Sequence, residues 1–126
     1  MHYMKKILLF FVILTAMGVN CFAQSQAAQV KALQGTWNLI GIMNDEESYN
    51  EQDIKKEGLE VAYIFSKNSL TINKAGEIIG PVDFSPEGAY LELSLSGGPA
   101  GSLPYFLNAN ILVIHEGSYA FIYRKK

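Results

Sequence analysis

One histidine beyond the N-terminal segment is the first candidate for chemistry. His115 could donate a hydrogen bond to a ligand or transfer a proton. The only cysteine of the chain is Cys21, so the cysteine and histidine clusters that bind zinc are missing. Catalysis needs several positioned partners around a histidine, and none is apparent in the sequence around His115. We therefore expect a structural or solvated His115, with no metal site and no cofactor.

Four carboxylates are the second candidate. Glu60, Asp83, Glu92 and Glu116 could converge in pairs, as glycoside hydrolysis requires, but nothing in their spacing selects a pair. The chain contains no Gly-x-Ser-x-Gly nucleophile motif. We therefore expect a protein without catalytic residues and keep a small hydrolase as the third of three hypotheses.

An acidic segment and a glycine-rich segment complete the polar candidates. The acidic residues Asp45, Glu46 and Glu47, followed by Glu51 and Asp53, could attract a cation, but their spacing matches no EF-hand loop. They are expected to form a solvated loop and the start of a helix. The glycines from Gly97 to Gly101 lack the Lys-Ser/Thr of a phosphate-binding loop. This segment is expected to be a flexible hairpin loop.

Aromatic side chains alternate along two segments, Tyr63 with Phe65 and Tyr119 with Phe121 and Tyr123. Residues two apart on a strand share a face. Such a face fits a packed core, and it equally fits an apolar pocket with hydroxyl groups, since ligand pockets are mostly apolar with a few polar groups. Both interpretations stay open on the sequence.

Two short helices are predicted in the chain. Residues 25–34 are rich in Ala and Gln, with Val30 and Leu33 at helical spacing before Gly35. Ser48 and Glu51 have the spacing of a capping box, and Gly58 would end that second helix. The second helix has few apolar residues, so the segment from Ser48 to Glu57 is expected to lie on a surface or over an opening, where it could act as a lid.

The remaining chain alternates apolar and polar residues between turn signals, which predicts strands. On the first strand, Trp37 and Met43 are predicted to share a face. The connections are too short for parallel crossovers, so the sheet is expected to be antiparallel. Eight strands in sequence-neighbour order are enough to close an up-and-down barrel. The predicted strands are 36–43, 59–66, 69–73, 77–84, 89–96, 103–108, 110–115 and 118–124, and Pro81 favours a bulge or edge position in the fourth.

The chain resembles the lipocalin-like, or calycin, proteins, particularly short exported bacterial ones. The resemblance rests on Gly35-Thr36-Trp37, a Gly-x-Trp motif that starts the first strand after a short helix, and on Arg124 near the end of the last strand. It implies an eight-stranded barrel in which Arg124 packs across Trp37 and ties the last strand to the first. The chain lacks the disulfide and the long C-terminal helix of larger lipocalins.

The N-terminus predicts export. Lys5 and Lys6 precede an apolar run at residues 7–17 and a small-residue exit at Cys21-Phe22-Ala23, which is the layout of a signal peptide. The apolar run is too short to remain as a membrane span. Asn20 before Cys21 argues against lipid attachment. The expected domains are a signal peptide at 1–23 and a barrel at 24–126, placed in the periplasm or outside the cell.

Two binding hypotheses follow, and the formal net charge of −2 argues against nucleic acid as the partner of either. In the first, the barrel holds a small apolar molecule against residues Met43, Tyr63, Phe65, Leu91, Leu93 and Tyr105. In the second, the barrel is filled and its outer surface or loops bind a protein or a glycan at the cell envelope. The packing inside the barrel distinguishes the two, because a ligand needs a cavity whereas a filled barrel has none.

Overall fold

The alternating segments form one antiparallel sheet in the computed structural model, which describes residues 25–95 and 98–126. Each strand from β3 onward pairs with the next, β1 pairs with β3, and β1 also pairs with β9, so eight strands close into a barrel. The short β2 adds to the end of β1. The strands are β1 (Gly35–Met43), β2 (Ser48–Tyr49), β3 (Val61–Ser66), β4 (Ser69–Lys74), β5 (Glu77–Glu87), β6 (Tyr90–Leu95), β7 (Gly98–Asn108), β8 (Ile111–Glu116) and β9 (Tyr119–Lys125).

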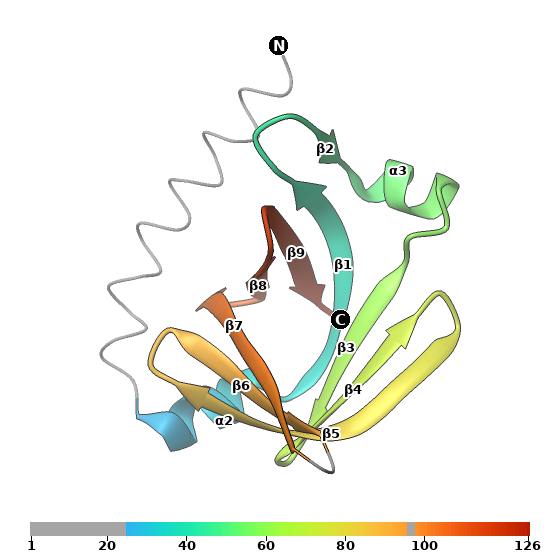
Figure 1. Cartoon of the computed structure of the whole chain (residues 1–126). Coiled ribbons are helices and arrows are strands. Elements are labelled where there is room, and N and C mark those ends of the chain that lie inside the picture. The colour runs from blue at the N-terminus through green and yellow to red at the C-terminus, as the bar shows by residue number, and fades with distance from the viewer. Residues whose placement is uncertain (1–24, 96–97) are drawn as a thin grey trace.

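The predicted fold class is confirmed: the protein is an eight-stranded antiparallel barrel, with one helix before the first strand and one between the first strands of the barrel. Figure 1 shows helix α2 (Gln26–Leu33) at the lower left of the barrel and helix α3 (Glu51–Lys56) at its upper right. The predicted signal peptide, including Cys21, lies outside the described residues.

Helix α2 covers the lower end of the barrel in Figure 1. The Ser25 hydroxyl caps the helix by accepting from the backbone N–H of Ala28. On the buried side, Leu33 has no exposed surface, and the Gln29 side chain donates to the carbonyl of Gly88. The helix therefore closes this end with an aliphatic side chain and ties itself to the turn between β5 and β6.

Helix α3 begins two residues later than predicted. Asn50, and not Ser48, is its N-cap: the Asn50 side chain accepts from Asp53 N–H, and the Asp53 carboxylate accepts from Asn50 N–H. The prediction failed because Ser48 pairs with Met43 in β2 and is therefore extended. The expected stop is confirmed, since Gly58 adopts a positive φ of 69° directly after the C-cap residue Glu57.

Two further local features bear on the predictions. The predicted bulge near Pro81 is present, because the β4–β5 register shifts between Leu70 and Ile72, opposite the segment from Ile79 to Val82. The predicted loop at 97–101 is wrong for its last four residues, since β7 starts at Gly98 and pairs Gly98 with Leu95. Turn-type residues thus extend a strand here, because backbone pairing with β6 needs no side chain.

Candidate functional site

Five of the six residues predicted to line a cavity point into the barrel. Tyr63, Phe65, Leu91 and Tyr105 belong to the buried core, and Leu93 is partly buried against it. They meet Trp37, Tyr123 and Phe84 from other strands. The structure therefore brings these five residues together inside the barrel, a choice of face that the alternation of the strands alone does not make.

Met43 is the exception, and a bulge in β1 explains it. The β1–β9 register shifts between Leu39 and Gly41, so Ile40 is an extra residue that reverses the faces beyond it. Ile42 consequently joins the core with Trp37 and Leu39, while Met43 packs against Val113 and Ala120 in a separate cluster. The prediction that Trp37 and Met43 share a face, and with it the placement of Met43 in the lining, is wrong.

The barrel interior is packed at the level of these side chains. Leu91 and Tyr105 are both 0% exposed, so neither has surface that a water molecule could touch. Aromatic rings contact one another across the interior: the ring centroids of Tyr63 and Tyr123 are 4.7 Å apart, and those of Phe65 and Phe84 are 4.9 Å apart. The side chains that were predicted to contact a ligand therefore pack against one another.

Helix α3 contributes to the core at the opposite end from α2. Its one fully buried side chain, Ile54, is 1% exposed and belongs to the same apolar cluster as Leu33. Each end of the barrel thus has a helix with one fully buried aliphatic residue in the core, and Val30 of α2 packs against it as well. The polar side chains of α3 are left outside.

The implied packing of Arg124 on Trp37 is contradicted by the structure. Trp37 points inward and its indole N–H donates to the carbonyl of Leu33 at 2.8 Å. The cation over the Trp37 ring is Lys125, whose Nζ lies 5.3 Å from the ring centroid. Arg124 is the neighbouring residue on β9, so it points to the opposite face, where it pairs with Glu51 of α3 at 3.2 Å.

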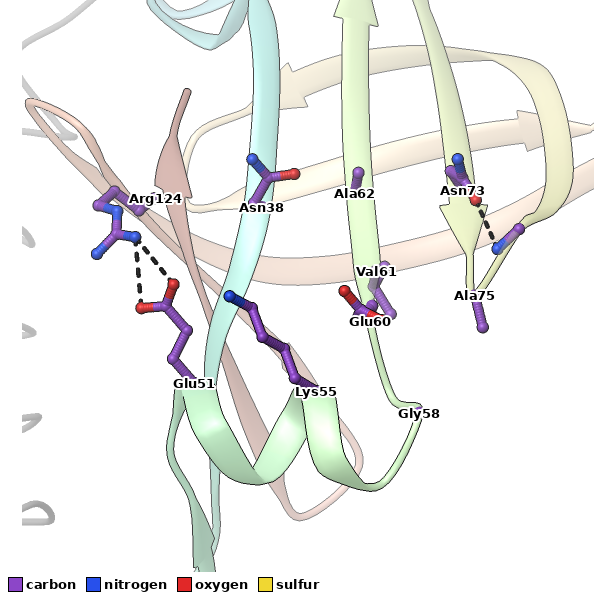
Figure 2. A pocket seen from close by; sticks show the side chains of 11 residues that line it. Asn38, Glu51, Lys55, Gly58, Glu60, Val61, Ala62, Asn73, Ala75 and Arg124 are labelled. Atoms are coloured by element: carbon purple, nitrogen blue, oxygen red, sulfur yellow. Dashed lines mark hydrogen bonds and ion pairs between the residues drawn. The ribbon is translucent and has the colours of Figure 1, made fainter.

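A polar groove of about 580 Å³ lies outside the barrel wall, next to α3 (Figure 2). Its floor is one row of residues across β9, β1, β3 and β4, in which Arg124 pairs with Asn38, Asn38 with Ala62, and Ala62 with Asn73. All four alternate with inward-facing residues, so they face outward. The small side chain of Ala62 leaves room between the two asparagines.

Helix α3 forms one wall of the groove. Glu51 and Lys55 are one helical turn apart and therefore lie on the same side of α3. Figure 2 shows Glu51 meeting Arg124 while the Lys55 side chain extends toward β1. A second contact holds the preceding loop to β9, because the Tyr119 hydroxyl donates to the Glu47 carboxylate at 2.8 Å. Residues of β9 thus hold the first residue of α3 and the loop before it.

The other wall is formed by Glu60 and the turn between β4 and β5. The backbone N–H of Ala75 donates to the carbonyl of Glu60 at 2.8 Å, which joins the turn to the start of β3. Asn73 Oδ1 accepts from the N–H of Gly76, which leaves the Asn73 amide NH₂ to donate. The groove therefore offers carboxamide groups on its floor and the charges of Lys55 and Glu60 at its walls.

Among the remaining candidates for chemistry, Asp83 and Glu92 are diagonal neighbours on one face of the sheet, because Asp83 pairs with Ser94 and Ser85 pairs with Glu92. Glu60 is in the groove, Asp83 and Glu92 are on β5 and β6, and Glu116 ends β8. His115 is half-buried with its ring against Phe106, and burial lowers its pKa. Among the described residues, no group of three or more His, Cys, Asp or Glu side chains could hold a metal ion.

Buried tyrosines are the most strongly perturbed titratable groups. Burial raises the pKa of Tyr63 to about 12, and the negative charge of Glu116 adds to this shift. Burial also raises the pKa of Tyr123, whose hydroxyl is hydrogen-bonded to that of Tyr63. Both groups are neutral near pH 7, so they contribute polar packing to the core and no charge.

Most groove residues escaped the sequence predictions. Asn38, Lys55 and Asn73 carry no motif, although Asn38 is the neighbour of Trp37 on the first strand and therefore lies on the opposite face. Only the strand register shows that Asn38 and Asn73 flank Ala62. The available signal was a set of polar residues on the outward faces of adjacent strands beside a polar helix.

No protein-family model matches the chain, and neither a curated protein nor a solved structure matches it significantly. The barrel agrees with the fold that the lipocalin-like resemblance implies. Within residues 25–95 and 98–126, no helix has both the length and the apolar character needed to cross a membrane.

Proposed function

We propose that this protein is an exported, non-enzymatic binding module whose filled barrel displays the groove beside α3 to a polar partner at the cell envelope. The observation that carries the proposal is the groove itself, about 580 Å³ in volume and lined by Asn38, Asn73, Lys55 and Glu60. The apolar side chains of its lining are Val61, Ala62 and Ala75. Small apolar molecules bind in pockets lined mainly by hydrophobic and aromatic side chains, so this groove suits a polar partner.

The interior supports the same choice between the two binding hypotheses. An apolar ligand inside the barrel would need space beside Leu91 and Tyr105, both of which are 0% exposed. A filled barrel instead provides a rigid wall, because close-packed side chains resist rearrangement. The outward row from Arg124 to Asn73 is then held at fixed spacing by four paired strands.

Native mass spectrometry of protein purified from its own host tests this proposal. The decisive variant is Ala62→Arg, which places a long side chain between Asn38 and Asn73. Its matched control is Ser66→Arg, which adds the same charge to an exposed outward position at the other end of β3. We expect a bound species on the wild type and on Ser66→Arg, and its loss from Ala62→Arg.

Two results would contradict the proposal. One is a bound species that Ala62→Arg retains at the wild-type level. The other is a small apolar molecule that leaves only when the protein unfolds, which would place the ligand inside the barrel and support the first hypothesis.

A further inference from the structure

The charges of the groove are arranged in two different ways. Glu51 and Arg124 form an ion pair with each other at 3.2 Å, so their charges compensate locally. Lys55 and Glu60 are both exposed and come from different elements, α3 and the segment before β3. Figure 2 shows both lining the groove beside the floor strands. A cation and an anion therefore remain available to a ligand at two separate positions.

The floor between these charges matches the polar groups of a peptide backbone. An asparagine carboxamide, like a peptide group, has both an N–H donor and a C=O acceptor. Asn38 and Asn73 lie on either side of Ala62, two inter-strand steps apart, which corresponds to about 10 Å. That separation exceeds a single peptide group and fits a ligand with more than one peptide group.

We propose that the groove binds short zwitterionic peptides, with the ligand carboxylate at Lys55, the ligand ammonium at Glu60 and the backbone amides at Asn38 and Asn73. This inference rests on the proposed function of the groove and adds the chemical class of the ligand. A ligand with only one charge leaves Lys55 or Glu60 without a partner, and it gains one charge-assisted hydrogen bond fewer.

Triglycine and its two capped forms test this proposal directly. At pH 6.5 triglycine is zwitterionic, N-acetyl-triglycine carries only the carboxylate, and triglycine amide carries only the ammonium. Binding is followed by two-dimensional NMR of ¹⁵N-labelled protein, in which the side-chain NH₂ signals of Asn38 and Asn73 report directly on the floor. We expect triglycine to shift both signals and each capped form to bind about five- to tenfold more weakly.

Charge-removing variants assign each end of the peptide to a residue. In Lys55→Gln, triglycine and triglycine amide should bind equally, because the carboxylate has lost its partner. In Glu60→Gln, triglycine and N-acetyl-triglycine should bind equally for the corresponding reason. The matched controls are Lys56→Gln and Glu57→Gln, exposed neighbours on the same segment, which should keep the full preference for triglycine.

The outcomes separate this proposal from the broader one. Equal binding of all three peptides, with shifts at Asn38 and Asn73, would overturn the zwitterion preference and leave groove binding intact. Shifts confined to other parts of the barrel, or none with triglycine at tens of millimolar, would overturn the peptide class. The proposed function itself fails only through the two results of native mass spectrometry described above.

Discussion

The inner and outer faces of the same four strands, β9, β1, β3 and β4, have opposite characters. Inside, Tyr123, Trp37, Tyr63 and Leu70 are at most 4% exposed and pack into one cluster. Outside, the row of Arg124, Asn38, Ala62 and Asn73 lines an open polar groove. The inner face thus uses its side chains for stability, and the outer face leaves its side chains available for binding.

The largest expected effect comes from the inner face. Leu91→Ala should lower the free energy of unfolding by about 2 to 5 kcal/mol, because it leaves a cavity in a packed core. Urea unfolding measures this loss, and Leu59→Ala, at a position 39% exposed, is the control with a small effect. A loss below about 1 kcal/mol for Leu91→Ala would mean that the interior is loosely filled, which would break the contrast between the two faces.

The next largest effect is expected from alkaline pH, which should lower the free energy of unfolding through the buried tyrosines of the inner face. The pKa of Tyr63 is raised to about 12 from its ordinary value of 10.0, so the folded protein holds this proton more tightly than the unfolded chain. The corresponding stability is present below pH 10 and is lost as the pH rises through 12, on the order of 3 kcal/mol. Unfolding measured between pH 9 and 12 should show the decline in the wild type.

Tyr63→Phe should flatten this decline, whereas Tyr90→Phe, at a position 50% exposed, should leave it unchanged. Burial raises the pKa of Tyr123 as well, so part of the decline is expected to persist in Tyr63→Phe. An identical decline in the wild type and Tyr63→Phe would contradict the assignment to this residue.

A smaller effect is expected at α3, which contributes both to the core and to the wall of the groove. Asn50→Ala removes the N-cap side chain and one half of the capping box, at a cost of about 1 kcal/mol. Because α3 forms a wall of the groove, the same variant should also weaken groove binding. Gln52→Ala, an exposed position on the same helix, should change neither property. Unfolding and peptide titration on the same samples measure both.

The smallest expected effects separate two adjacent cations on β9. Lys125→Ala should cost about 0.5 to 1 kcal/mol, because it removes the cation over the Trp37 ring. Arg124→Ala should cost less than about 0.5 kcal/mol, since its ion pair with Glu51 is half exposed. The reverse order in chemical unfolding would favour the arginine closure that the lipocalin-like resemblance implies.

The sequence was sufficient to predict the strands and helices because alternation and turn residues are local signals. Alternation places Tyr63 with Phe65 and Leu91 with Leu93 on shared faces, as in the structure, but only the closed sheet shows that these faces point inward. The prediction failed at Met43 because an inserted residue in a strand leaves no local mark, and only the pairing of β1 with β9 reveals it.

The groove was beyond prediction for a related physical reason. Asn38 and Asn73 are brought together by the registers of β1 with β3 and of β3 with β4. Such registers depend on the whole sheet. The resemblance was wrong about Arg124. It places a cation near the end of the last strand, but neighbouring residues of a strand point to opposite faces, so an offset of one residue decides which cation reaches the tryptophan.

The extra residue at Ile40 has a consequence for the outside of the barrel. Before it, β1 presents Asn38 to the exterior, and beyond it Met43 takes the exterior position beside Val113 and Ala120. The outer side of β1 is therefore polar before Ile40 and apolar after it. Because Met43, Val113 and Ala120 are nearly buried, only the half of β1 at Asn38 offers its outer side to an approaching molecule.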